Sequence, residues 1–483
     1  MLFTEPFFLF VFLPLTLACY YAVPQRFRNT VLALASLVFY SFGELRFLLW
    51  LVASVAVNYW IARGIETRRD TPWARRLLVL GVASDLALLV VFKYAGFIVG
   101  NVNAVLGAAG IAPFTLPEIR LPLGISFFTF HKISYKVDVY RGTAEAKKTP
   151  TDLALYILVF PQLIAGPIVR YYEIAGELAR RVTTRAGFAE GVRRFVVGLG
   201  KKMIVANTVA YCADRVFAIP VAELTAPLAW LGVVCYALQI YFDFSGYSDM
   251  AIGLARMFGF HFPENFDHPY TSASITEFWR RWHMSLSRWF RDYLYVPLGG
   301  NRRSPPRVTL NLAVVFLLCG LWHGASWTFV VWGAFHGALL GIERAGFGRL
   351  LDAAPRVLRH GYTLAMVLVG WVFFRAETLP YAAAYIRAMS GLGTGDGVRY
   401  YPAYYLDREL IVVAVIGLVA SAPVRGRISH FLDRTIANLD SGRARLIDVS
   451  RACLSFALLS SIFVYSVMSA AVDTYNPFIY FRF

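Results

Sequence analysis

Two histidines lie in sequence surroundings that would let a side chain move protons inside a membrane. His323 occurs in Cys319-Gly-Leu-Trp-His-Gly-Ala-Ser-Trp327, and the preceding residues 309–321 carry no charge. We therefore expect His323 inside the membrane body, with Gly324 allowing close approach of a substrate or of another backbone. Histidine suits general base catalysis because its pKa lies near neutral pH. The alternative is a buried histidine bonded to a neighbouring backbone carbonyl.

The residues around His323 extend this candidate site. Ser326 and Trp327 follow it by three and four residues, which would place them beside it on one helix face. Trp322 directly precedes it, and we expect all three near the substrate. A later histidine, His336, would lie about 140° away on an unbroken helix. We therefore assign His336 a structural or supporting position unless the helix bends.

The second candidate, His283, lies in a segment with a clear helix start. Ser274-Ile-Thr-Glu277 has the spacing of a capping box and predicts a helix over 277–293. On that helix His283 falls on an aromatic, apolar face, whereas Arg280 and Arg281 fall on the opposite face. This pattern is typical of a helix in the membrane interface. A lone histidine on an apolar face is usually a core residue, but the aromatic stripe and the second histidine favour function.

A third group consists of Asp243, Ser245 and Asp249, at the end of the apolar run that reaches 239–249. Acids at membrane depth are costly, so the default interpretation is a functional one, such as substrate binding. The alternative is that both acids cap a helix break at Gly246.

Other catalytic signatures are absent from the sequence. There is no phosphate-binding glycine loop, no zinc motif and no nucleophile elbow. The five cysteines are widely spaced in or beside apolar runs, which indicates buried hydrophobic residues rather than a metal site. We expect no bound metal and no tightly bound cofactor.

The elements that must position these residues are membrane helices. Of 483 residues, 58% are hydrophobic and 16% charged, and the mean hydropathy is +0.55. A soluble protein of this length would need more surface charge. The net charge of +17 comes from short arginine and lysine clusters between apolar runs, which favours cytoplasmic loops over nucleic-acid binding.

Apolar runs long enough to cross a bilayer predict about eleven spans in an all-α polytopic protein. The expected spans are 7–23, 30–43, 47–62, 77–96, 189–211, 225–242, 309–322, 327–343, 358–375, 409–423 and 452–471. Three interrupted runs, 98–115, 122–130 and 153–169, are expected to be re-entrant, and 424–451 to be an interfacial loop or helix. Arginines in 24–28 and 63–76 predict that these loops are cytoplasmic and the N-terminus is outside. The first run lacks the positive flank of a signal peptide and is expected to be retained.

Several long strings resemble the membrane-bound O-acyltransferase family, in particular the membrane subunits of bacterial alginate O-acetyltransferases. The strings are QIYFDFSGYSDMAIGLARMFGF, FPENF, SITEFWRRWHMSLSRWFRDYLYVPLGGN, LWHGASWTFVVWGAFHG, FLFVFLPL, FPQLIAGPIVR, GWVFFRA and the closing FIYFRF. The resemblance covers nearly the whole chain. It implies one membrane-embedded domain over 1–483 with a core segment at 239–343, folded as a ring of tilted helices around a central funnel.

The resemblance also implies a reaction. Such proteins take an activated acyl group from the cytoplasmic side and pass it to an extracytoplasmic acceptor; a related member handles D-alanine for teichoic acids. The family's signature histidine falls on His323 and its second functional histidine on His283. His323 would deprotonate the acceptor hydroxyl and His283 would meet the thioester end of the donor. Arg280, Arg281, Arg302 and Arg303 would attract donor phosphates, and Trp282 would lie beside the substrate.

The expected donor is acetyl-CoA or another cytoplasmic thioester, and the expected acceptor a polysaccharide hydroxyl. A periplasmic acetyltransferase or SGNH-like protein is the expected partner, in the inner membrane of a bacterium. Three alternatives remain: a conduit that leaves transfer to a partner, D-alanyl or other acyl transfer to a cell-envelope polymer, and a transporter of unrelated chemistry, although no inverted repeat is visible. One departure from the family pattern is His131-Lys132, where an uncharged pair such as Gln-Ala is expected.

Overall fold

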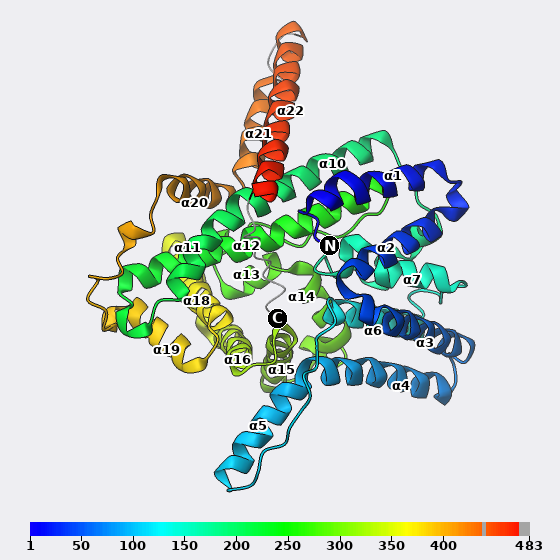
Figure 1. The fold of residues 1–483 in the computed structure, drawn as a ribbon, viewed down its shortest axis with the longest axis horizontal. Coiled ribbons are helices and arrows are strands. Elements are labelled where there is room, and N and C mark those ends of the chain that lie inside the picture. The colour runs from blue at the N-terminus through cyan, green and yellow to red at the C-terminus, as the bar shows by residue number, and fades with distance from the viewer. Residues whose placement is uncertain (437–440, 473–483) are drawn as a thin grey trace.

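The chain folds into helices, and the prediction of an all-α membrane protein is confirmed. The computed structural model describes residues 1–436 and 441–472, and this part contains no strand. The closing FIYFRF motif lies outside the described residues. Most helices gather in one body, from which α5 and the pair α21–α22 project (Figure 1).

The α-helices have the following bounds. The first eleven are α1 (Leu13–Ala22), α2 (Arg28–Glu44), α3 (Leu48–Thr67), α4 (Pro72–Leu89), α5 (Ala95–Ala108), α6 (Ile125–Arg141), α7 (Pro150–Leu158), α8 (Phe160–Leu163), α9 (Tyr171–Ala179), α10 (Arg185–Gly200) and α11 (Asn207–Phe217). The others are α12 (Ala226–Met257), α13 (Ile275–Arg281), α14 (Met284–Phe290), α15 (Pro305–His323), α16 (Trp327–Ile342), α17 (Gly348–Ala353), α18 (Arg356–Arg375), α19 (Leu379–Arg387), α20 (Arg408–Ala420), α21 (Val424–Ile436) and α22 (Ser441–Val472).

In the described residues, seven helical stretches are long and apolar enough to cross a membrane, fewer than the eleven expected spans. The difference has two causes. The expected spans 30–43 and 47–62 form one continuous stretch, Gln25–Thr67, because a single 3-10 turn joins α2 to α3. The expected spans 7–23, 327–343 and 409–423 are helical, but each apolar helix there is shorter than the 18 residues taken as the minimum for crossing a membrane.

Two of the three interrupted runs have the protein cover that was predicted. Residues 153–169 break into α7, α8 and an extended segment and are buried except for the half-buried Ala154, and residues 125–130 of the run 122–130 form the buried start of α6. The run 98–115 is different, because α5 contains no buried residue and projects from the body (Figure 1). The stretch 424–451 is helical, as α21 and the start of α22.

The longest helix contact in the body is made by glycines. α10 and α12 lie side by side (Figure 1), and Gly191 faces Gly253 while Gly198 faces Gly246. A β-carbon on any of the four would lie 2.6–2.8 Å from the carbonyl oxygen of the facing glycine. The seven-residue spacing on both helices is two helical turns, so the two contacts lie on one face. Small residues therefore bring the two backbones together, as in many membrane helix pairs.

We expect Gly198→Ala to lower the stability of the folded protein, because the added methyl group would meet backbone atoms of α12 rather than a movable side chain. Overpacking of this kind typically costs about 1–3 kcal/mol. Gly361→Ala in α18 is the matched control, since nothing lies within 4 Å of its added β-carbon. Thermal denaturation in detergent measures both, and equal midpoints would contradict the contact.

The arginine-rich segments meet on one face of the protein. Segments 25–29, 63–69, 141–152, 178–183 and 291–292 are joined by hydrogen bonds. The bonds are Gln25 to the Arg181 carbonyl (3.1 Å), Asn29 to Asp152 (2.7 Å), Ala146 N–H to Glu66 (2.8 Å) and Arg141 to the Asp292 carbonyl (3.1 Å). These contacts place the clusters on a single side, as a cytoplasmic face requires.

A reporter fused in the loop at 64–75 should therefore read cytoplasmic. The reason is that positively charged loops are retained on that side during insertion. Paired reporters active only in the cytoplasm or only in the periplasm make the measurement. A periplasmic reading would reverse the orientation.

Candidate active site

His323 is the last residue of α15 and lies inside the protein. Its side chain is 6% exposed. Aromatic rings surround it, with centroids at 4.9 Å for Trp322, 5.2 Å for Trp332 and 5.0 Å for Phe374. The chain leaves the helix at Gly324, which is extended. A β-carbon there would collide with the ring of Phe329 at 2.2 Å, so this glycine serves packing rather than the substrate approach expected from the sequence.

His283 is equally buried but occupies a helix break. The predicted continuous helix over 277–293 is wrong: α13 ends at Arg281, His283 is left-handed with φ 43° and ψ 53°, and α14 begins at Met284. The connector before α13 causes the break. The N–H of Asp267 donates to the carbonyl of Arg281, and the N–H of Met284 donates to the carbonyl of Asn265, so backbone groups of the break are satisfied outside the helix.

Both histidines lie beside the same indole ring, that of Trp322. The centroid of Trp322 is 6.2 Å from that of His283 and 4.9 Å from that of His323. Phe130 stacks on the indole at 5.3 Å and fixes its plane. Burial lowers the pKa of His283 to about 3, so its imidazole is neutral at pH 7. A neutral imidazole has one nitrogen free to accept a proton.

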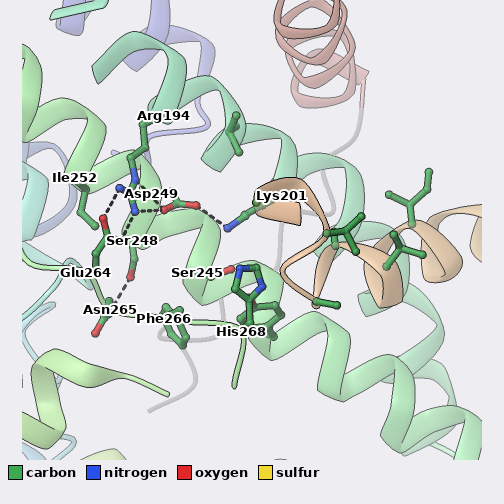
Figure 2. A pocket seen from close by; sticks show the side chains of 18 of the residues that line it. Arg194, Lys201, Ser245, Ser248, Asp249, Ile252, Glu264, Asn265, Phe266 and His268 are labelled. Carbon is green, nitrogen blue, oxygen red and sulfur yellow. Dashed lines mark hydrogen bonds and ion pairs between the residues drawn. The ribbon is translucent and has the colours of Figure 1, made fainter. Parts of the chain in front are cut away.

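Two cavities approach this pair from different sides. The larger, about 860 Å³, is lined by α10, α12, the connector and the ends of α20 and α21, and its polar lining includes Ser245, Ser248 and Asn265 (Figure 2). The smaller, about 150 Å³, is lined by residues 121–127 together with Trp322 and His323. The small cavity therefore reaches His323 directly, whereas the large cavity reaches Asn265, whose side chain bonds to His283.

The acids of α12 are held by cations. Asp249 accepts from Lys201 at 2.6 Å and from Arg194 at 2.8 Å, in the wall of the large cavity (Figure 2). Asp243 pairs with Lys202 at 2.7 Å. The alternative that both acids cap a break at Gly246 is wrong, because α12 runs without interruption. Ion pairing with α10 and the turn that follows it offsets the cost of these acids at depth.

Comparison with known proteins identifies the family of the chain. A model of the membrane-bound O-acyltransferase family matches residues 108–376. A protein named probable alginate O-acetylase from Azotobacter vinelandii is 43% identical, with both chains covered completely. The same-named protein of Pseudomonas aeruginosa is 49% identical over 82% of this chain and 76% of its own. A peptidoglycan O-acetyltransferase of Helicobacter pylori is 36% identical over 81% and 80%.

The chain belongs to the membrane-bound O-acyltransferase family. It is a multi-pass membrane enzyme that transfers acyl groups to oxygen. The predicted family resemblance is therefore confirmed. The catalytic assignment of His323 and His283 stays a prediction. The geometry of this O-acyltransferase adds that both imidazoles lie beside the indole ring of Trp322.

Some predicted site residues lie outside the lining of both cavities. Ser326 bonds to Thr328 at 2.7 Å, and Trp327 is exposed and donates to Asn101 at 2.9 Å, because α15 ends at His323 and the expected helix face does not exist. The ring of Trp282 contacts that of Trp371 in a tilted arrangement, with centroids 4.8 Å apart, and Arg281 pairs with Glu277 at 2.8 Å. Arg280, Arg302 and Arg303 are exposed.

His336 supports the site through a neighbouring ring. The chain bends between α15 and α16, so the two helices form a hairpin and the 140° argument for an unbroken helix does not apply. Trp332 lies against both His323 and His336, at 5.2 and 5.1 Å. His336 accepts from Trp279 at 3.4 Å. This is the supporting position expected from the sequence.

Sequence reasoning missed two residues that hold His323 in place. A π-helical turn, Val90–Tyr94, follows α4 and presents Lys93 and Tyr94 to the end of α15. The Lys93 ammonium donates to the carbonyls of Trp322 (2.5 Å) and His323 (3.2 Å), and the Tyr94 hydroxyl donates to the carbonyl of Leu321 (2.7 Å). These carbonyls have no partner within the helix. A lysine within an apolar run was the signal that could have found it.

The unexpected pair His131-Lys132 does not join the site. His131 is fully buried on α6 beside Tyr156, with ring centroids 5.6 Å apart, and lines neither cavity. Neither of its nitrogens has a hydrogen-bond partner in the described part of the chain. Lys132 pairs with Asp85 at 2.9 Å, and Lys136 bonds to the same carboxylate, so the cations connect α6 to α4.

We expect Lys93→Met to reduce acyl transfer more than it reduces folded protein. Loss of the ammonium leaves carbonyls at the end of α15 unpartnered, which typically costs about 1–3 kcal/mol each, and frees His323 to move. Activity per folded protein and the thermal midpoint measure the two effects separately. Lys148→Met, at an exposed position, is the control. Unchanged activity in the Lys93 variant would mean that the end of α15 does not need this contact.

Proposed function

We propose that this O-acyltransferase moves an acetyl group from a cytoplasmic thioester, acetyl-CoA or another, to hydroxyls of an extracytoplasmic polysaccharide. The observation that carries the proposal is that His283 and His323 both lie beside Trp322, with one cavity lined by His323 and a second lined by Asn265, the partner of His283. The names of the relatives support acetyl as the group and a cell-envelope polymer as the acceptor. The proposed location is the inner membrane of a bacterium.

The large cavity is the proposed donor side. It lies along the half of α12 that ends at Met257, whose carbonyl accepts a bond from Tyr21 near the arginine-rich face. Arg194 and Lys201 in its wall are suited to donor phosphates. They replace the four arginines expected from the sequence. The apolar side chains of α20 on the opposite wall fit the uncharged arm of a thioester carrier.

The small cavity is the proposed acceptor side. Its wall is formed by residues 121–127, which follow α5. The stretch from α4 to α5 is the single candidate span between these residues and the loop at 63–76, so the two lie on opposite sides of the proposed membrane. α15 begins beside Arg302 and Arg303 and runs from there to His323. His323 is thus at the end of the helix remote from those cations, where an extracytoplasmic hydroxyl would arrive.

The proposed reaction balances with these groups. His323 takes the proton from the acceptor hydroxyl, whose oxygen forms a bond to the thioester carbonyl carbon. The carbon–sulfur bond then breaks, and the departing thiolate receives the proton that His323 took from the acceptor, which leaves both histidines neutral. Between the formation of the new bond and the loss of the thiolate, negative charge develops on the carbonyl oxygen of the thioester. The indole N–H of Trp322, which has no hydrogen-bond partner among the described residues, is a donor available to that oxygen.

Two other outcomes are distinguishable. If the protein is a conduit, a periplasmic acetyltransferase or SGNH-like partner completes the transfer, and the purified protein will not acetylate a simple polysaccharide from acetyl-CoA. Transfer by the purified protein alone supports a direct reaction. D-alanyl or another acyl transfer is tested by offering the corresponding thioesters in the same assay.

His323→Ala should abolish acetylation while leaving insertion and yield intact. A positioned general base contributes about 10² to 10⁴-fold in rate, equivalent to roughly 3–5 kcal/mol of transition-state stabilisation. Polymer acetylation and folded yield are measured in the same cells. His336→Ala is the control and should be milder, because His336 contacts Trp332 rather than a cavity. Near-normal acetylation without His323 would mean that the base lies elsewhere, with His283 the next candidate.

A further inference from the structure

We propose that Asn265 is a positioning residue that fixes His283 as the tautomer with hydrogen on Nδ1, leaving Nε2 as the accepting end of the ring. The inference rests on the proposed function only in that His283 acts on the acyl donor. Asn265 belongs to the connector between α12 and α13 and is buried, and it also lines the large cavity (Figure 2).

The backbone decides which way the Asn265 carboxamide points. Its Oδ1 atom accepts from the N–H of Ser285 at 3.2 Å and from the Ser285 hydroxyl at 2.9 Å. A backbone N–H can only donate, so the atom facing it is the oxygen. The Nδ2 atom then donates to the Ser248 hydroxyl on α12 at 2.9 Å. The two ends of the carboxamide therefore cannot be exchanged.

The fixed oxygen in turn decides the protonation of His283. The Nδ1 atom of His283 lies 3.0 Å from Oδ1 of Asn265. A carboxamide oxygen has no hydrogen to give, so Nδ1 must carry the hydrogen and donate it. In a neutral imidazole the other nitrogen, Nε2, then holds a lone pair. Within the described part of the chain, Nε2 has no hydrogen-bond partner although it is buried.

Asn265 also fixes the conformation of the histidine. His283 is left-handed, which costs a residue with a β-carbon about 1–3 kcal/mol. The carbonyl of Asn265 accepts from Met284 N–H at 2.9 Å, directly after the strained residue. The ring of Phe244 contacts the imidazole at 4.5 Å from the α12 side. One residue thus holds both the turn and the ring orientation.

The tautomer matters because the opposite one would place a hydrogen on Nε2. The ring would then carry a donor at Nε2, and it could no longer take a proton there. A hydrogen-bond acceptor that fixes the tautomer of a functional histidine is a common device. Among metal-binding histidines the loss of such a partner typically costs about 10–100-fold in metal affinity or activity, and we expect an effect of that order here.

Nitrogen NMR of the full-length protein labelled with ¹⁵N-histidine tests the tautomer directly. His283→Gln identifies the His283 signals by their disappearance. We expect a protonated Nδ1 and an unprotonated Nε2 in the unaltered protein, and loss of this pattern in Asn265→Leu. A protonated Nε2 in the unaltered protein would overturn the inference, whatever the substrate proves to be.

Acetyl transfer per folded protein provides the second readout. Asn265→Leu should lose about 10–100-fold, whereas Asn265→Asp keeps an acceptor oxygen and should restore much of the activity and the Nδ1–H signal. Asn311→Leu is the matched control, because Asn311 is equally buried but donates only to the Leu298 carbonyl. Equal losses in the Leu and Asp variants, or none in either, would contradict a role through the oxygen. Loss of activity in His283→Gln is a separate test of the proposed function.

Discussion

The structure depends on the need to give every backbone polar group a partner where water is excluded. Helices meet this need along their length but not at their ends, and both candidate histidines lie at helix ends inside the protein. His323 ends α15 and His283 separates α13 from α14. Each end is satisfied by a specific side chain or connector, the first by Lys93 and Tyr94 and the second by Asn265. The residues that complete the helix ends are therefore the ones that place the histidines.

The glycine contact between α10 and α12 holds together the two helices that line the large cavity. Because Gly198 and Gly246 allow the backbones to touch, Lys201 and Lys202 come within ion-pair distance of Asp249 and Asp243. Each buried acid thus has its cation on the neighbouring helix or on the turn that continues it. Packing and charge placement are consequences of the same small residues.

The sequence was sufficient to predict the helical class, the family and the burial of both histidines. Periodicity failed where tertiary contacts override it. The capping signal at Ser274 was correct, since its side chain accepts from the Glu277 N–H, but no local pattern showed that Asn265 and Asp267 would interrupt the helix at His283. In the same way, Ser326 and Trp327 were assigned to a helix face that ends at His323.

The residues that sequence reasoning missed are distant in the chain from those they serve. Lys93 contacts carbonyls about 230 positions away, and Asn265 stands outside the helix that it terminates. Such pairings form only when helices that are distant in the sequence pack together. A lysine in an apolar run is visible in one sequence, whereas its partner is not.

The separate anchoring of the two histidines means that they can be altered independently. Lys93 and Tyr94 come from the turn after α4, and Asn265 comes from the connector after α12, with no shared hydrogen bond between the two sets in the described residues. Substitutions at well-separated, unconnected positions have nearly additive effects. Any excess in a double variant would therefore measure cooperation through the indole ring between them, rather than a common scaffold.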